Sequence, residues 1–165
     1  MITRLRRAVD RGLESSLLVL MTVMVVNVAW QVFTRFVLRA PSPYTEELAR
    51  FLLIWTGLLG GCLAWRRKMH LAIRLFGGSA ESPPVWQRRT TLVVTAVFSL
   101  LLLVYGGLRL VFLVLELEQR SAALGVPLGY VYLAVPVSGL VLLFYASSEL
   151  LFGDDPGAEP EPGVS

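Results

Sequence analysis

Of the 165 residues, 55% are hydrophobic and only 16% are charged, and the mean hydropathy is +0.66. Soluble domains contain roughly 25% charged residues, so this composition argues against a water-soluble domain and predicts a few membrane spans joined by short loops. The net charge is +3, but the basic residues lie in short clusters between apolar runs and form no nucleic-acid-binding face, and the single Cys62 excludes an internal disulfide and a CxxC redox pair.

The first predicted element is an apolar span of 24 residues, from Leu13 to Phe36, which follows a basic segment at residues 1–12. A basic start before an apolar run also fits a signal peptide. The run is longer than the apolar core of such a peptide, however, and no A-x-A-like cleavage site closes it. We therefore expect a retained first span preceded by a cytoplasmic N-terminus.

A polar stripe marks the second half of this span. Asn27, Gln31 and Arg35 stand at i, i+4 and i+8, so in a helix they lie on one face. The corner that follows, residues 40–43 (APSP), cannot continue the helix, because each proline lacks an N–H and biases the preceding residue toward extended geometry. The pattern predicts a tight helical hairpin, which we interpret as an assembly feature and not as an active site.

The second predicted span begins just after this corner. Thr45 is positioned to cap it, and Glu46 and Glu47 fall in its first turn, where the helix dipole favours carboxylates. Glu46 and Arg50 form an i, i+4 pair in the favourable order. Because Arg35 ends the preceding span one turn before the corner, we also expect it to pair with Glu46 or Glu47 across the bend.

Small residues lie within this second span, which covers about residues 45–65. Gly57 and Gly61 are four residues apart, with Gly60 and Cys62 beside them. Small residues at this spacing allow helices to approach closely in lipid, where no hydrophobic effect drives association. The alternative is simple tolerance of glycine in membrane helices. We expect close helix packing at Gly57 and Gly61.

A basic loop from Arg66 to Arg89 separates the second and third spans. Within it, Met69–Phe76 mixes apolar positions with charge, a pattern consistent with a short helix lying in the membrane interface. His70 is the only histidine of the chain, and no other metal-ligating residues accompany it. We therefore expect a loop or headgroup hydrogen bond at His70 and no metal site.

The third span, about residues 92–115, contains Arg109. An arginine inside a membrane span is a functional-site hypothesis by default. The competing account is structural: the side chain extends to the outer interface or pairs with Glu116 about two turns later. We favour the structural account. Gly106 and Gly107 precede the arginine and provide a second place where a neighbouring helix can come close.

The fourth span, about residues 127–152, starts with Pro127, which suits a first helical turn. Pro136 lies inside it and cannot donate to the carbonyl of Tyr132, so we expect a kink. Broken helices form ion sites in some transporters, but such sites need several polar groups at mid-depth. Only Ser138 lies near Pro136. The tail at residues 153–165 is acidic, rich in Pro and Gly, and predicted to be disordered.

These elements predict an all-α polytopic membrane protein, a bundle of four transmembrane helices. Lys and Arg number four in the N-terminal segment and six in the central loop, against at most four near the opposite ends of the spans. Because basic residues concentrate on the cytoplasmic side, we expect both termini and the central loop to be cytoplasmic.

Four blocks of the chain, in order, resemble the small membrane subunit of tripartite ATP-independent periplasmic (TRAP) transporters, the DctQ-like family. They are WQVFTRFV and PSPYTEELARFLLIW at the hairpin, the basic stretch with His70 and Leu71, and the run Ser121–Leu140 (SAALGVPLGYVYLAVPVSGL). The resemblance covers about residues 10–150. After the histidine the family usually shows an acidic residue, and that place holds Arg74 here.

This resemblance implies a partner role in the bacterial inner membrane. Such subunits associate with a large permease subunit that carries the substrate and sodium sites, and a periplasmic binding protein delivers the substrate, commonly an organic acid. Arg35, Glu47 and Arg50 match charged positions of the family's first hairpin. The resemblance implies no catalytic residue, cofactor or metal in this chain, and the spans themselves lack the carboxylates and polar cluster at mid-depth that a transport site needs.

Two other classes remain as alternatives. A stand-alone small four-helix exporter would use a glutamate in its first helix, but Glu14 lies near the membrane interface, and the central loop is longer than such a protein needs. An intramembrane serine protease would require a Ser–His pair at depth, whereas His70 falls in a predicted loop.

Overall fold

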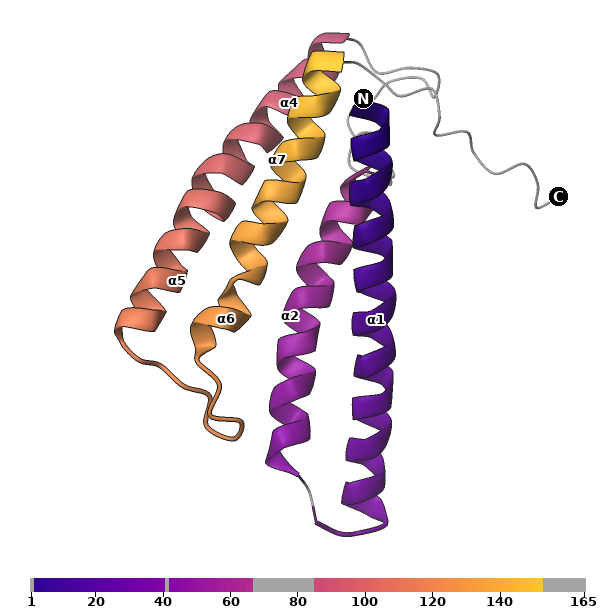
Figure 1. Cartoon of the computed structure of the whole chain (residues 1–165), viewed down its shortest axis with the longest axis vertical. Helices are drawn as coiled ribbons and strands as arrows, with labels where there is room; N and C mark the ends of the chain where they lie inside the picture. The colour runs from indigo at the N-terminus through magenta and orange to yellow at the C-terminus, as the bar shows by residue number, and fades with distance from the viewer. Residues whose placement is uncertain (1, 41, 67–84, 153–165) are drawn as a thin grey trace, which may run out of the picture.

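The computed structural model describes residues 2–40, 42–66 and 85–152, and within these ranges the chain is almost entirely helical, without a β-sheet. Seven helical segments follow one another (Figure 1): α1 (Ile2–Phe36), α2 (Pro43–Arg66), α4 (Val85–Phe98), the π-helix η1 (Ser99–Gly106), α5 (Gly107–Glu116), α6 (Leu128–Tyr132) and α7 (Ala134–Phe152). His70, the predicted interfacial helix at Met69–Phe76 and the acidic tail lie outside the described residues.

Four helical stretches are long and apolar enough to cross a membrane: Arg4–Phe36, Pro43–Arg66, Arg89–Glu116 and Leu128–Leu151. The shortest has 24 residues, about 36 Å at 1.5 Å per residue, against a hydrocarbon core of about 30 Å. The prediction of an all-α polytopic protein with four transmembrane helices is confirmed. The third span consists of α4, η1 and α5 in sequence, and the fourth of α6 and α7.

The four spans lie side by side in a row (Figure 1). The backbone of α1 runs beside α2, α2 packs against the fourth span, and α7 packs against the third span along α4 and η1; α1 reaches α7 through side chains at one end only. The row is therefore one helix thick, with α1 and the third span as its two edges. Large apolar side chains remain exposed along every span, including Leu18, Leu53, Leu102 and Leu140. Such a surface suits lipid or a protein partner and not water.

The start of α2 differs from the sequence prediction. The helix begins at Pro43, where the missing N–H costs nothing and the fixed φ fits a first helical turn. The hydroxyl of Thr45 donates to the carbonyl of Ser42 at 2.9 Å. The expected capping role of Thr45 is therefore wrong, because the helix starts two residues earlier and Thr45 already lies within its first turn.

The third and fourth spans each contain an irregularity, and the two face each other. The π-helix Ser99–Gly106 packs against α7, and the fourth span is interrupted at Leu133, as the missing N–H of Pro136 leads one to expect. A Cβ at Gly139 would lie 2.6 Å from Cβ of Leu103, and a Cβ at Gly107 would lie 3.0 Å from Cδ of Pro136. Both glycines thus permit an approach that any side chain would block.

Gly57 and Gly61 do not make the helix contact expected of them. No heavy atom of a neighbouring element lies within 4 Å of the position that a Cβ would occupy at either residue. Because the spans form a row, no helix of the described residues packs directly against this face of α2. It lines a hollow of about 470 Å³ together with side chains of the third span and α7, among them Phe98, Leu103 and Leu142.

Gly139 is closely packed and Gly57 is not, so substitution by alanine should have different effects at the two positions. In the chain purified alone in detergent, Gly139→Ala should lower the free energy of unfolding by about 1–3 kcal/mol, because its Cβ overpacks the contact with η1. Gly57→Ala, whose Cβ meets open space, should cause no loss. Reversible denaturant titration followed by circular dichroism measures both. Equal effects at the two positions would contradict this account of the packing.

Candidate functional site

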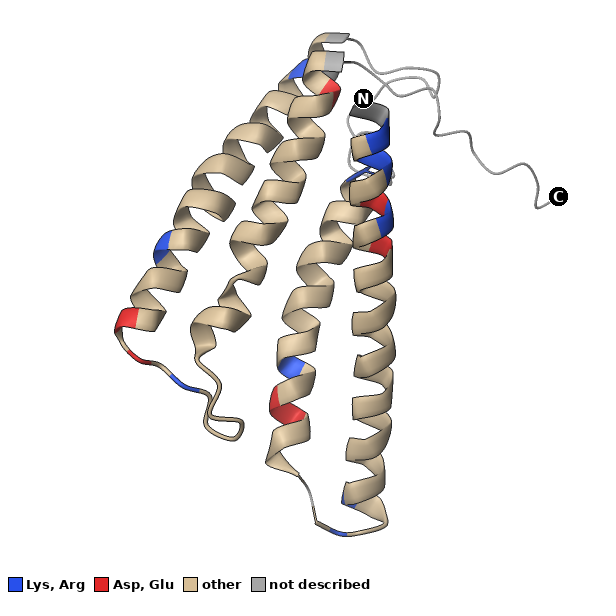
Figure 2. Ribbon diagram, viewed as in Figure 1, with Lys and Arg blue, Asp and Glu red and all other residues tan. Residues whose placement is uncertain are grey.

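Charged residues gather near the two ends of the row (Figure 2). One end holds the N-terminus of α1, the C-termini of α2 and α7 and the start of α4, and we call it the N-terminal end (Figure 1). The other holds the α1–α2 turn and the loop at residues 117–127, and we call it the loop end. Each end contains a cluster of polar contacts between different spans.

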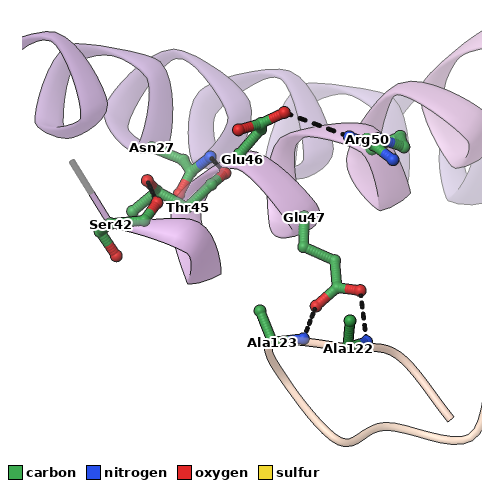
Figure 3. A network of polar contacts seen from close by, with 8 residues as sticks. All are labelled: Asn27, Ser42, Thr45, Glu46, Glu47, Arg50, Ala122 and Ala123. Carbon is green, nitrogen blue, oxygen red and sulfur yellow. Dashed lines mark hydrogen bonds and ion pairs between the residues drawn. The ribbon is translucent and has the colours of Figure 1, made fainter.

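At the loop end, the side chain of Glu47 binds the backbone of a distant loop. Its Oε1 accepts the N–H of Ala122 at 3.1 Å, and its Oε2 accepts those of Ala123 and Leu124 at 2.9 and 2.8 Å. Figure 3 shows the Glu47 side chain turned away from Glu46 and toward this loop. Hydrogen bonds to an ionised acceptor are stronger than neutral ones, so the carboxylate fastens the loop between the third and fourth spans to α2.

The loop is closed by its own backbone, which is why three successive N–H groups converge. The N–H of Ser121 donates to the carbonyl of Val126 at 2.9 Å, and that of Gly125 donates to the carbonyl of Ser121 at 3.1 Å. Gly125 has a φ of +67°, in the left-handed region that favours glycine. This turn leaves the N–H groups of residues 122–124 free to form an anion-binding concavity, and Glu47 supplies the anion.

Asn27 connects α1 to the start of α2. It is 8% exposed, and its Nδ2 donates to the carbonyl of Thr45 at 2.8 Å (Figure 3). Gln31 is half-buried and Arg35 is exposed. Four residues exceed one helical turn by about 40°, so a stripe at i, i+4 and i+8 winds around the helix and leaves the contact with α2. Of the three residues in the predicted stripe, only Asn27 therefore links the two helices of the hairpin directly.

The expected pairing of Arg35 with Glu46 or Glu47 is wrong. Glu47 is occupied by the loop, and Glu46 pairs with Arg50 at 3.2 Å, as predicted from their spacing. Within the described residues no ion pair joins Arg35 to either glutamate. The side chains of Glu46 and Arg50 are 66% and 68% exposed, and an exposed i, i+4 pair contributes only about 0.3–0.5 kcal/mol. Glu47, and not Glu46, is therefore the carboxylate that joins separate elements.

At the N-terminal end, three spans meet through the carboxylate of Asp10. This residue of α1 is 8% exposed; it accepts the hydroxyl of Tyr145 from α7 at 2.7 Å and pairs with Arg66 at the end of α2 at 2.6 Å. The guanidinium of Arg66 also lies 5.8 Å from the ring centroid of Tyr145, within cation–π range. One buried carboxylate thus joins α1, α2 and α7.

A second contact ties α1 to α7 at the same end. Arg6, which is buried, donates from Nε to the hydroxyl of Ser148 at 3.1 Å and from its terminal nitrogen to the carbonyl of the same residue. Neither the Asp10 contacts nor the Arg6 contacts are predicted from the sequence. The available signal in the sequence was Asp10, the single acidic residue of the basic N-terminal segment. Its partners Arg66 and Tyr145 lie 56 and 135 positions away.

The structure also places Arg109 and Pro136. Arg109 is exposed on α5, and no ion pair joins it to Glu116, so the pairing considered from the sequence is wrong. Pro136 is buried against Gly107. Among the described residues no group of three or more His, Cys, Asp or Glu could hold a metal ion. The two polar clusters can hold helices and a loop together, but neither presents an arrangement suited to catalysis.

Glu47 and Glu46 are adjacent, which makes a matched test of the loop contact possible. In Glu47→Gln, the amides of Ala122–Leu124 should lose protection from hydrogen exchange, because the side chain loses its charge and one of its two acceptor atoms. Glu46→Gln should leave these amides unchanged. Hydrogen exchange with mass spectrometry on the chain in nanodiscs measures the difference. Unchanged protection in Glu47→Gln would contradict the anchoring role.

Comparison with known proteins matches the sequence of this chain to one family. The profile of the family described as "Tripartite ATP-independent periplasmic transporters, DctQ component" matches residues 16–153. The chain is 27% identical to the sialic acid TRAP transporter small permease protein SiaQ of Vibrio cholerae, over 85% of this chain and 80% of that protein. It is 24% identical to a putative TRAP transporter small permease protein of Haemophilus influenzae, over 86% and 87% of the two chains. The chain therefore belongs to the DctQ component family of tripartite ATP-independent periplasmic transporters.

Proposed function

We propose that this chain, as a TRAP transporter small permease subunit, is a scaffold that supports a large permease subunit and has no transport activity alone. The large subunit would carry out sodium-coupled uptake of an organic acid delivered by a periplasmic binding protein. The family is one of transporter subunits and not of enzymes.

The position of the polar contacts is the observation that supports the scaffold role. Glu47 and Asp10 are each bound by other parts of the same chain, near opposite ends of the spans. Between them the described spans are packed mainly through apolar and small residues such as Gly107 and Gly139. A carrier must replace the hydration of an anion and its coupling cations, which needs several polar groups converging near the membrane midplane.

The name of one relative supports the proposed class of substrate. The protein of Vibrio cholerae is named for sialic acid, which is an organic acid. At 27% identity, and with the substrate site assigned to another subunit, this supports an organic acid as the substrate class but no particular compound. The exporter alternative is not favoured, because the family match covers most of the chain.

The orientation follows from charge. The start of α1, the end of α2, the start of α4 and the end of α7 share the N-terminal end of the row (Figure 1). Ten Lys and Arg residues belong to the sequence segments 1–12 and 66–89, which adjoin these helix ends, and at most four lie near the opposite ends of the spans. Under the positive-inside rule, the N-terminal end faces the cytoplasm of a bacterial cell, and the loop end faces the periplasm.

The scaffold role predicts a strict requirement for partners. The chain alone in liposomes with a sodium gradient should accumulate no sialic acid or other organic acid. Uptake should begin when the large permease and the binding protein are added, and should fall to background when this chain is omitted. Radiolabelled substrate uptake measures all three conditions. Sodium-driven uptake by this chain alone would overturn the scaffold role.

The orientation has its own test. Alkaline phosphatase is active only in the periplasm and green fluorescent protein mainly in the cytoplasm, so paired fusions report the side of each position. Fusions after Gly78 and at the C-terminus should give fluorescence without phosphatase activity. A fusion at Ser42 should give the reverse. Fluorescence at Ser42 would show that the assigned orientation is wrong.

A further inference from the structure

Arg109 lies on the edge of the row that the third span forms. The third span contacts only α6 and α7 of the fourth span, so its opposite face meets no other part of the described chain. In α5 the buried residues are Gly107, Val111 and Val114. Residues two apart in a helix point about 200° from each other, so Arg109 faces away from both Gly107 and Val111. The arginine is exposed and therefore lies on the uncovered edge.

Arg109 lies inside the third span, and its Cα–Cβ bond points away from the membrane surface nearest to it. Seven residues, about 10 Å of helix, separate Arg109 from Glu116 at the end of the span, and twenty, about 30 Å, separate it from Arg89 at the other end. Side chains on a helix tilt toward its N-terminus. The Cα–Cβ bond of Arg109 thus points toward the midplane, so the side chain must turn back to extend to the headgroups at the Glu116 end.

No acidic group of the described chain neutralises this arginine. Glu116 and Glu118 are the nearest carboxylates in sequence, both exposed, and neither forms an ion pair with it. A charge at this depth is costly in lipid and is expected to face a partner of opposite charge. The adjacent positions on the same face are aromatic: Tyr105, one turn before, is 64% exposed, and Phe112, about one turn after, is 63% exposed. Arginine and aromatic residues are the types enriched in protein interfaces.

We propose that Arg109, flanked by Tyr105 and Phe112, is a docking site for a carboxylate on a transmembrane helix of the large permease subunit. The proposal rests on the proposed function, because it requires that subunit as the partner. A carboxylate can accept two parallel N–H bonds from the guanidinium, which satisfies the charge without water. A lipid phosphate at the headgroups of the Glu116 end is the competing occupant, and the crosslinking arm of the test distinguishes the two.

The test compares single-site variants of this chain co-expressed with the large permease. Arg109→Leu should reduce the amount of permease that co-purifies by about tenfold or more, since the acidic partner would remain buried and unpaired. Arg109→Lys, which keeps the charge but not the planar donor pair, should retain an intermediate amount. Arg120→Leu, a control at an exposed arginine in the loop, should have no effect. Arg109→Leu alone in detergent should keep the circular dichroism spectrum and elution volume of the wild type.

A crosslinking arm distinguishes protein from lipid. The photoreactive residue p-benzoylphenylalanine, placed at Phe112, should crosslink to the permease, whereas the same residue at Leu18 on the opposite edge of the row should not. Full co-purification of the Arg109→Leu variant, or adducts only to phospholipid at Phe112, would overturn the docking site while leaving the scaffold function intact. Failure of the wild-type chain to bind the permease at all would overturn both.

Discussion

The four spans lie in a row, so each leaves much of its surface uncovered by the others, and this constraint determines how the fold is held. In a row one helix thick, the buried share of the apolar stretch ranges from 11% in the first span to 39% in the fourth. Since apolar side chains gain nothing by leaving lipid for each other, specific contacts must fix the helices. They are the close approaches at Gly107 and Gly139 and the polar contacts of Asp10 and Glu47. The uncovered faces are left for other molecules.

The pairing of irregular elements shows how the third and fourth spans recognise each other. A π-helix is rare, and Pro136 removes a backbone hydrogen bond from the fourth span. Each would be a defect in an isolated helix. Together they fit, because Gly139 admits the backbone of the π-helix at Val104 and Gly107 admits the ring of Pro136. Two local departures from regular helix thus produce one close-packed contact.

Local patterns in the sequence predicted much of this structure, and the errors have one physical origin. The four spans, the Glu46–Arg50 pair and the disturbance near Pro136 follow from hydrophobicity, spacing and a missing N–H. The bond from Glu47 to the loop could not be predicted, because it joins residues 75 or more positions apart. Spacing identified the small face at Gly57 but could not show that no helix of the described ranges packs against it. The sequence of a helix shows which of its faces carries small residues, but not which element packs against that face.

The contacts of Asp10 and Arg6 also constrain the order in which the protein can mature in the membrane. During synthesis, Arg66 emerges long before Tyr145 and Ser148, so α1 and α2 can form their hairpin first, through Asn27 and the Asp10–Arg66 pair. Until the last span is made, Asp10 lacks the tyrosine and Arg6 lacks Ser148. Insertion of the fourth span then completes the cluster, so in a nascent chain stalled before residue 145 the first helix is held to α2 alone and lacks both contacts with α7.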